Sequence, residues 1–335
     1  MTERRKAAQV LTEKYFQIMS KVETKKSTLS VSENGLEKPA GAKRVEVLKT
    51  YKLYIGGEFP RTESGHYYVP VNAAGEQLGN MSLSSRKDFR DAVGKARAAF
   101  KGWSARAAFN RGQILYRMAE MLEGRKAQFI EELVKQDATK AQAQKEVNLA
   151  IDRLVFYAGW CDKYQQIFSS VNPVASSHFN FSVPEPTGVV AVIGPQDSGL
   201  IGLVSVIAPL IAGGNACIIL AAENKPLSAI TFAEVLNSSD LPGGVVNILT
   251  GKPSELYMHF ASHMDVNAVV YCGNDKNVQR EIQVKASENV KRTLNYGNIN
   301  WMNESGQSPY FILDAQEIKT TWHPIENIGG GGSKY

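Results

Sequence analysis

The stretch from Glu185 to Gly251 constrains the fold of this chain more than any other. Three short apolar runs within it, rich in β-branched residues, are Val189–Ile193, Ala216–Leu220 and Val245–Leu249. Runs this short and this apolar are typical of strands that are buried on both faces. Two apolar stretches of helical length, Leu200–Ala212 and Leu227–Leu236, separate them. Because strand–helix–strand–helix–strand requires parallel pairing with helices on both faces of the sheet, the sequence predicts an α/β fold.

Several segments of this stretch carry a family resemblance. They are Glu185–Val192 (EPTGVVAV), Ile207–Pro209 with Gly214–Asn215, and Leu241–Gly251 (LPGGVVNILTG). In this order they resemble the cofactor-binding domain of the aldehyde dehydrogenase superfamily, and the resemblance extends from about Tyr51 to Thr293. Ser262–Ala268 and Lys319–Ile325 are similar in particular to the shortened, non-catalytic C-terminal unit of two-unit aldehyde dehydrogenases and its free-standing bacterial relatives.

The resemblance implies a Rossmann-like parallel sheet, an N-terminal helical part and a small oligomerisation β-hairpin, without a catalytic domain. We expect four regions: a basic N-terminal helix and linker over 1–50, an aldehyde dehydrogenase-like cofactor-binding domain over 51–313, an oligomerisation strand over 314–327, and a flexible tail over 328–335. Within the second region we expect a helical part at 85–168 and the Rossmann-like core at 185–295.

Local patterns predict the remaining elements. The expected helices are Ala7–Val22, one that begins with a capping box at Ser85, Asn110–Leu122, Lys126–Gln136, Ala141–Phe168, Ser254–Ala261 and Lys276–Ser287. The expected strands are a hairpin at Tyr51–Phe59, an edge strand at Asn180–Pro184, Val266–Tyr271, a strand near Val290–Leu294, and a last strand at Ala315–Ile325.

Charge is concentrated at the N-terminus. Residues 1–50 carry 11 Lys/Arg against 6 Glu, whereas residues 51–335 carry 27 of each sign. A basic arm could contact nucleic acid or a membrane, but interleaved acids and the lack of stacking aromatics over 25–49 favour a solvated linker, and Glu3 and Glu13 argue against a mitochondrial presequence. No apolar run reaches bilayer length, and three widely spaced cysteines suggest neither disulfides nor a metal site, so we expect a cytoplasmic protein without metal.

The residues that aldehyde oxidation needs are changed. An aldehyde dehydrogenase uses a cysteine thiolate, an oxyanion donor and a base. The family places the donor in a Pro-Trp-Asn motif that reads Pro195-Gln196-Asp197 here, and an ionised carboxylate cannot donate a hydrogen bond. Asn295 stands where the family has its glutamate base. The family's cysteine lies in a separate downstream domain, for which we expect no room in the forty residues that follow.

The cofactor positions are also altered. The family's Lys-Pro-Ser-Glu motif for the adenine ribose reads Ala221-Ala222-Glu223-Asn224, and its Gly-Ser pair at the pyrophosphate reads Gly273-Asn274. The resemblance implies an NAD site formed by Pro195, Gln196, Asn224, Gly251, Gly273 and Asn274. The free amides at the helix start after Asn274 would remain an anion site. The changes predict that NAD binding is weak or lost.

Other candidate groups have more ordinary interpretations. Cys272 ends a predicted strand near the cofactor positions, but a lone cysteine on an apolar strand is more often packing, and Cys161 and Cys217 are read as core residues. His259 and His263 have the i, i+4 spacing of a metal pair without further ligands, which favours a role near a helix end. Asp197 lies where α/β sheets bind ligands and could hold a cation or an amine.

These observations favour an inactive aldehyde dehydrogenase-like domain that works by association. We expect a homo-oligomer, or a hetero-oligomer with a full-length aldehyde dehydrogenase, and no nucleic-acid or membrane partner. One alternative is an NAD-binding subunit that completes an aldehyde-oxidising complex, which rests on fold resemblance alone. Another is a sensor that binds a small molecule in the vacated crevice.

Overall fold

The computed structural model describes residues 47–325. The expected N-terminal helix, linker and C-terminal tail fall in 1–46 and 326–335 and lie outside the described residues. The chain divides into two compact units, Met1–Val47 and Leu48–Tyr335, and every described strand and helix belongs to the second.

Strands and helices alternate through most of this second unit. The strands are β1 (Thr50–Tyr51), β2 (Tyr67–Tyr68), β3 (Asn80–Ser82), β4 (Ser170–Asn172), β5 (His178–Pro186), β6 (Val189–Ile193), β7 (Ala216–Leu220), β8 (Val246–Leu249), β9 (Ala268–Tyr271), β10 (Arg292–Asn295) and β11 (Gln316–Pro324). The helices are α2 (Arg86–Ser104), α3 (Ala108–Gly124), α4 (Lys126–Lys135), α5 (Lys140–Trp160), α6 (Tyr164–Phe168), α7 (Ile201–Ala212), α8 (Leu227–Asn237), α9 (Pro253–Ser262), α10 (Lys276–Ser287), the 3-10 turn η1 (Glu304–Gly306) and α11 (Tyr310–Asp314).

The central sheet has five parallel strands in the order β10-β9-β6-β7-β8. All five residues of β6 and of β7 are buried, as expected for strands covered on both faces. Alternate residues face opposite sides. Val189 and Ala191 belong to a core with α2 and α9, whereas Val190 and Val192 belong to a larger core with α7 and α8. The predicted α/β fold is confirmed.

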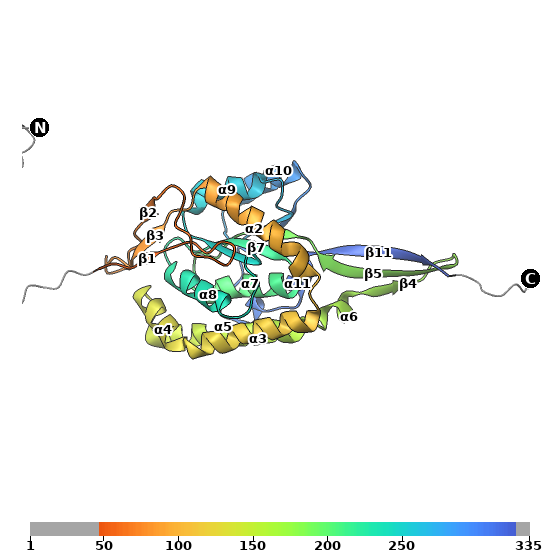
Figure 1. Cartoon of the computed structure of the whole chain (residues 1–335), viewed down its shortest axis with the longest axis horizontal. Coiled ribbons are helices and arrows are strands. Elements are labelled where there is room, and N and C mark those ends of the chain that lie inside the picture. Colours follow the sequence, from red (N-terminus) through yellow and green to blue (C-terminus); the bar gives the residue numbers. More distant parts are fainter. Residues whose placement is uncertain (1–46, 326–335) are drawn as a thin grey trace, which may run out of the picture. The chain divides into compact units, whose positions relative to one another are not determined.

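Helices cover both faces of this sheet (Figure 1). Helices α2, α9 and α10 lie on one side, and α7 and α8 lie on the other with α3, α4 and α5 outside them. Helix α7 is apolar all round and every one of its residues is buried, because it lies between the sheet and α5.

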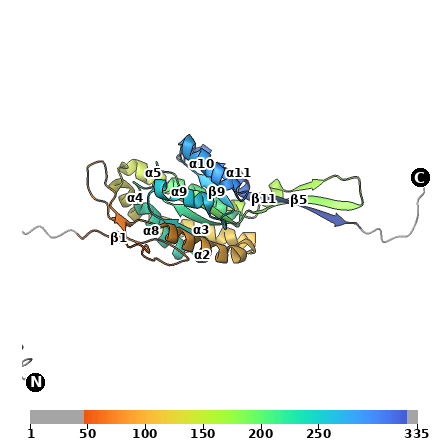
Figure 2. The ribbon, with the colours of Figure 1, turned by 90° about the horizontal axis from the view of Figure 1, so that it is seen from above.

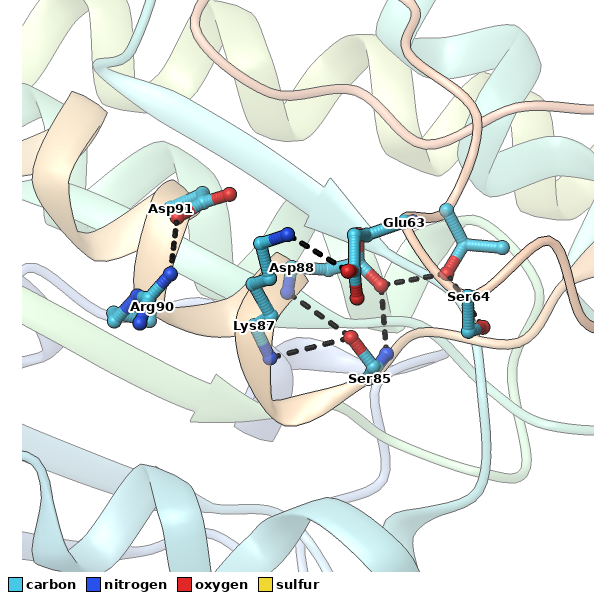
Figure 3. Close-up of polar contacts among 8 residues, drawn as sticks. Glu63, Ser64, Ser85, Lys87, Asp88, Arg90 and Asp91 are labelled. Atoms are coloured by element: carbon cyan, nitrogen blue, oxygen red, sulfur yellow. Dashed lines mark hydrogen bonds and ion pairs between the residues drawn. The ribbon is translucent and has the colours of Figure 1, made fainter.

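The predicted capping box begins α2 (Figure 3). The Ser85 hydroxyl accepts hydrogen bonds from the N–H groups of Lys87 and Asp88, and the Asp88 carboxylate accepts one from the Ser85 N–H at 2.7 Å. Asp88 is buried, and Thr62 Oγ1 and the Glu63 N–H also donate to its carboxylate, at 2.6 and 2.9 Å. The box therefore fixes both the helix start and the preceding loop.

A second sheet projects from the α/β body in two perpendicular views (Figures 1 and 2). We call this three-stranded sheet, with the order β11-β5-β4, the arm. The prediction of an edge strand at Asn180–Pro184 is wrong, because β5 is the central strand and pairs with β4 and β11, both antiparallel. Polar side chains bond across it: Asn172 Nδ2 donates to Asn180 Oδ1 and Ser182 Oγ at 2.6 and 2.9 Å. The last predicted strand is present as β11.

Two other predicted elements differ in detail. The helix expected over Ala141–Phe168 is interrupted, because the N–H groups of Cys161 and Lys163 bond to carbonyls three residues back and form a turn between α5 and α6. The hairpin expected at Tyr51–Phe59 has its Gly-Gly turn and is closed by the Ile55–Glu58 bridge and by a hydrogen bond from the Leu53 N–H to the Pro60 carbonyl at 3.0 Å. Tyr54 pairs instead with β8.

Residues 296–315, which we call the connector, lead from β10 directly to β11. The connector is packed against α5 and α7, and Trp301 and Ile312 are buried. The guanidinium of Arg153, on α5, is buried and donates to Ser205 Oγ, Gln307 Oε1 and the carbonyls of Trp301 and Gly306. Burial lowers the pKa of Arg153, and its hydrogen-bond acceptors are uncharged. The connector is therefore packed into this fold and held there by hydrogen bonds.

Candidate functional site

The candidate site is the edge of the sheet at which the parallel strands end. In the sheet, β7 lies on one side of β6, and β9, which comes later in the chain, lies on the other side. The connections that follow β6 and β9 therefore leave this edge in opposite directions. Open α/β sheets bind ligands at such a switch point. The structure brings the sequence-predicted residues together there: Pro195–Asp197 follow β6, Ala221–Asn224 follow β7, Gly251 follows β8, Gly273–Asn274 follow β9 and Asn295 ends β10.

Gln196 joins two of the loops at this edge. Its Nε2 donates to the Gly194 carbonyl at 2.8 Å, and its Oε1 accepts from the Glu223 N–H at 3.0 Å. Lys225 Nζ donates to the main-chain carbonyl of Asp197 at 2.9 Å. Asp197 itself is exposed. These hydrogen bonds hold the loops after β6 and β7 together.

The two positions expected to be degenerate lie on strands separated by β9. Asp197 is exposed after β6, and Asn295 is exposed at the end of β10, where its Oδ1 accepts from the Gly297 N–H at 3.1 Å. An ionised carboxylate has no proton to donate to an oxyanion, and an amide takes no proton from water at neutral pH. Neither side chain can therefore supply the oxyanion donor or the base that the resemblance leads us to expect at these positions.

The cysteines are unsuited to act as nucleophiles. Cys161, Cys217 and Cys272 are free and buried. Burial is the main cause that raises the pKa of the Cys272 thiol, and the nearby Asp197 carboxylate raises it further. Burial also raises the pKa of Cys217, and that of Cys161 to about 12. All three therefore remain neutral thiols at physiological pH.

The helix start after β9 is already capped. The Asp275 carboxylate accepts hydrogen bonds from the N–H groups of Asn277 and Val278 at 2.8 and 3.3 Å. The expectation that these amides are free for an anion is wrong, because a side chain of the protein binds them. Gly273 is also crowded, since a Cβ there would come within 2.4 Å of the Tyr271 hydroxyl.

The helix start after β6 is occupied in the same way, by a residue that the sequence analysis missed. Glu146 on α5 accepts from the N–H groups of Leu200 and Ile201 at 2.9 and 3.0 Å, and from Ser198 Oγ at 3.1 Å. The Glu146 carboxylate therefore caps the positive N-terminal end of the α7 dipole, where an anion would otherwise bind. No local pattern around Glu146 indicates the role, because its partners are more than fifty residues away.

These features indicate how well a dinucleotide would fit at this edge of the sheet. Carboxylates follow three neighbouring strands, at Asp197, Glu223 and Asp275, and both helix starts are capped from within the protein. A pyrophosphate would meet negative charge and would find these amides already bonded. Ala221 and Ala222 are buried and offer no polar side chain, Glu223 is half-buried, and Asn224 is exposed. The residues at this edge fit NAD poorly.

Metal centres and membrane spans are two further classes of functional feature. Within residues 47–325, no group of three or more His, Cys, Asp or Glu side chains is arranged to hold a metal ion. In the same part of the chain, no helix combines the length and hydrophobicity that crossing a membrane requires.

Known proteins share this architecture. The profile described as "Aldehyde dehydrogenase family" matches residues 59–324. Cytosolic 10-formyltetrahydrofolate dehydrogenase of Mus musculus is 32% identical over 282 residues, which cover 81% of this chain and 30% of that protein. An aldehyde dehydrogenase of Enchytraeus buchholzi is 30% identical over 275 residues, covering 80% of this chain and 53% of that protein. The chain thus spans about half or less of the length of these relatives.

A solved structure gives the same correspondence. The NAD+ complex of an aldehyde dehydrogenase from Bacillus cereus superposes with a TM-score of 0.69, at 24% identity, over 74% of this chain and 50% of that one. At this identity the likeness establishes a common fold.

Proposed function

Because the chain belongs to the aldehyde dehydrogenase family, we propose that it is a non-catalytic member, a pseudoenzyme that acts as a structural or regulatory subunit beside a full-length aldehyde dehydrogenase. The observation that carries the proposal is the connector. By resemblance, the catalytic cysteine belongs to a separate domain downstream of the motif that matches Asn295. Here the connector joins β10 to β11 in residues 296–315, and Arg153 holds it against the body. It leaves no room for such a domain between these strands.

The residues at the sheet edge support the same proposal. Asp197 cannot donate to an oxyanion, Asn295 cannot act as the base, and the thiol of Cys272 is buried beside a carboxylate. Supplying one of these groups again would not restore aldehyde oxidation, since the nucleophile, the donor and the base are needed together.

The arm supports the associative role. Apolar side chains on it are exposed, including Val171 at 67%, Ile318 at 54% and Trp322 at 56%. Among the described residues, β11 pairs on one side only, so the main-chain groups of its other edge are open to a further strand. We propose that a full-length aldehyde dehydrogenase subunit covers this arm, since a protein of the same fold offers a matching sheet.

The alternative is an NAD-binding subunit of an aldehyde-oxidising complex. One observation favours it: a cavity of about 500 Å³ lies between α9 and α10 and includes Met258, Asn277 and Arg280 in its lining. A ribose and base could lie there. The carboxylates at Asp197, Glu223 and Asp275 oppose the pyrophosphate that would have to follow.

The test combines an activity assay with light scattering. The purified chain is assayed for NADH formation from aldehydes, alone and mixed with a full-length aldehyde dehydrogenase from the same source. We expect no turnover by the chain alone and a stable complex in the mixture. Trp322→Ser should weaken the complex about tenfold, because buried aromatic anchors dominate interfaces. Tyr67→Ser, an equally exposed aromatic on β2, is the matched control and should not weaken it. Turnover by the chain alone, or a monomer that forms no complex, would refute the proposal.

A further inference from the structure

A small basic cavity lies on the α2 and α9 side of the sheet. It has a volume of about 250 Å³ and lies between the first turns of α2 and the last turn of α9. Four basic side chains line it, Arg86, Arg90, His259 and His263, and none of the described residues in its lining carries a carboxylate. The cavity is smaller than the sites of drug-sized ligands, and its size and basic lining suit a small anion.

Aromatic packing makes one wall of this cavity rigid. Phe89 is fully buried and stacks on Phe260 with ring centroids 4.1 Å apart. The ring of His263 stands edge-on to Phe89 at 5.7 Å and 89°. His263 Nδ1 accepts a hydrogen bond from the Asp265 N–H at 3.3 Å, so the neutral ring carries its proton on Nε2. His263 is therefore a donor of fixed orientation.

The basic side chains of α2 differ in their partners (Figure 3). Lys87 lies outside the cavity lining and forms a 2.7 Å ion pair with Glu63. Among the described residues, the ion pair of Arg90 is with its neighbour Asp91, at 3.5 Å with both side chains largely exposed, and such pairs are weak. Arg86 belongs to none of the ion pairs found among the described residues. The two arginines of the cavity therefore keep donors available for a ligand.

The histidines have an environment that disfavours their charged form in the absence of an anion. Burial is the largest cause that lowers the pKa of His259, and the Arg86 guanidinium adds to it. Burial is also the largest cause that lowers the pKa of His263. The other charged groups around His263 are Asp265, which raises its pKa, and Lys291, Arg86 and Arg90, which lower it. An anion in the cavity would offset this repulsion and favour protonation of His259, while His263 donates from Nε2 as a neutral ring.

We propose that this cavity is a binding site for a phosphate group, held by Arg86, Arg90, His259 and His263. Planar guanidinium groups match phosphate oxygens with paired donors, and charge-assisted hydrogen bonds of this kind are strong. The C-terminal end of α9 stabilises protonated histidine at His259. The proposal does not depend on the associative role, because no group of the sheet edge takes part.

The test is a calorimetric titration of the full chain with inorganic phosphate, and in a second arm with a small phosphomonoester. Binding should tighten as the pH falls from about 8 to about 6, because the bound anion raises the pKa of His259. The ring proton signals of His259 in nuclear magnetic resonance should show this rise directly. The double substitution Arg86→Gln, Arg90→Gln should weaken binding at least about tenfold.

Lys87→Gln is the matched control, because it removes a charge from the same helical turn but lies outside the cavity lining. Lys87→Gln should change the affinity for phosphate by less than about twofold, because it alters only the long-range charge around the cavity, which salt screens. Tighter binding of the phosphomonoester would identify an organic phosphate as the ligand, and equal binding would identify free phosphate. The proposal is overturned if phosphate at about 10 mM neither binds nor shifts the His259 signals. Equal weakening by the control and the double variant would also overturn it.

Discussion

Replacing Arg153 by methionine should loosen the connector. Methionine keeps most of the aliphatic length of arginine but donates no hydrogen bond, so the carbonyls of Trp301 and Gly306 lose their donor. A buried acceptor without a partner costs about 1–3 kcal/mol. Gln307 is half-buried and can rehydrate, while Ser205 keeps its bond to the Ile201 carbonyl at 2.5 Å. The gross loss from the two carbonyls is therefore about 2–6 kcal/mol.

Part of this loss is offset, because the folded protein no longer has to desolvate a guanidinium whose pKa burial lowers. We expect a net decrease of about 2 kcal/mol in the free energy of unfolding, measured by urea titration with an unchanged m value. Amide exchange should accelerate over residues 300–308 and not in the sheet. A decrease below about 0.5 kcal/mol with unchanged exchange would refute the claim that Arg153 holds the connector.

Three further predictions concern buried groups. Glu132 is buried with Oε2 unpaired and Oε1 accepting from Thr231, and burial is the main cause that raises its pKa. The contribution of Glu132 to the free energy of unfolding is therefore fully present below the unfolded pKa near 4.5. It is lost as the pH rises through the higher pKa that Glu132 has in the folded state. Glu132→Gln should accordingly be more stable by about 1 kcal/mol at neutral pH and lose that advantage in acid, as urea midpoints across pH will show; an equal gain at every pH would contradict this. Tyr157→Phe removes the 3.1 Å bond to the Ser308 carbonyl and should cost about 1 kcal/mol by urea titration, less than Arg153→Met; a larger cost would contradict the ranking. The thiol of Cys272 should react with a thiol reagent only at the rate of opening of the structure, because burial keeps it protonated; fast labelling of the folded chain would contradict its burial.

Much of the central sheet can be predicted from local pattern. Strands β6 and β7 and helix α10 begin and end at the predicted residues, because the strands are short, continuous apolar runs and the helix is a periodic one, each with clear stop signals. The arm was harder to predict. Alternation around Asn180 indicates a strand, but whether that strand is central or at an edge depends on pairing with β11, more than 130 residues away. Local sequence carries no information about that pairing.

The candidate site could likewise be predicted from the sequence only in part. The carboxyl ends of the strands could be predicted from the order of the elements, and Asp197 and Asn295 from the resemblance. Asp275 had a readable signal, an aspartate immediately before a helix, and so could have been recognised as the cap that binds the helix amides. Glu146 could not, because it caps α7 from another helix. Contacts between a side chain and a distant backbone are set by packing.

The most direct test of the account is a calorimetric titration of the purified chain with NAD, with a full-length aldehyde dehydrogenase as the positive control. The capped helix starts and the three carboxylates at the sheet edge predict no saturable binding below about 1 mM. Saturable binding with a Kd of about 10 μM would contradict the account. It would mean that the sheet edge still accepts a dinucleotide despite Asp197, Glu223 and Asp275.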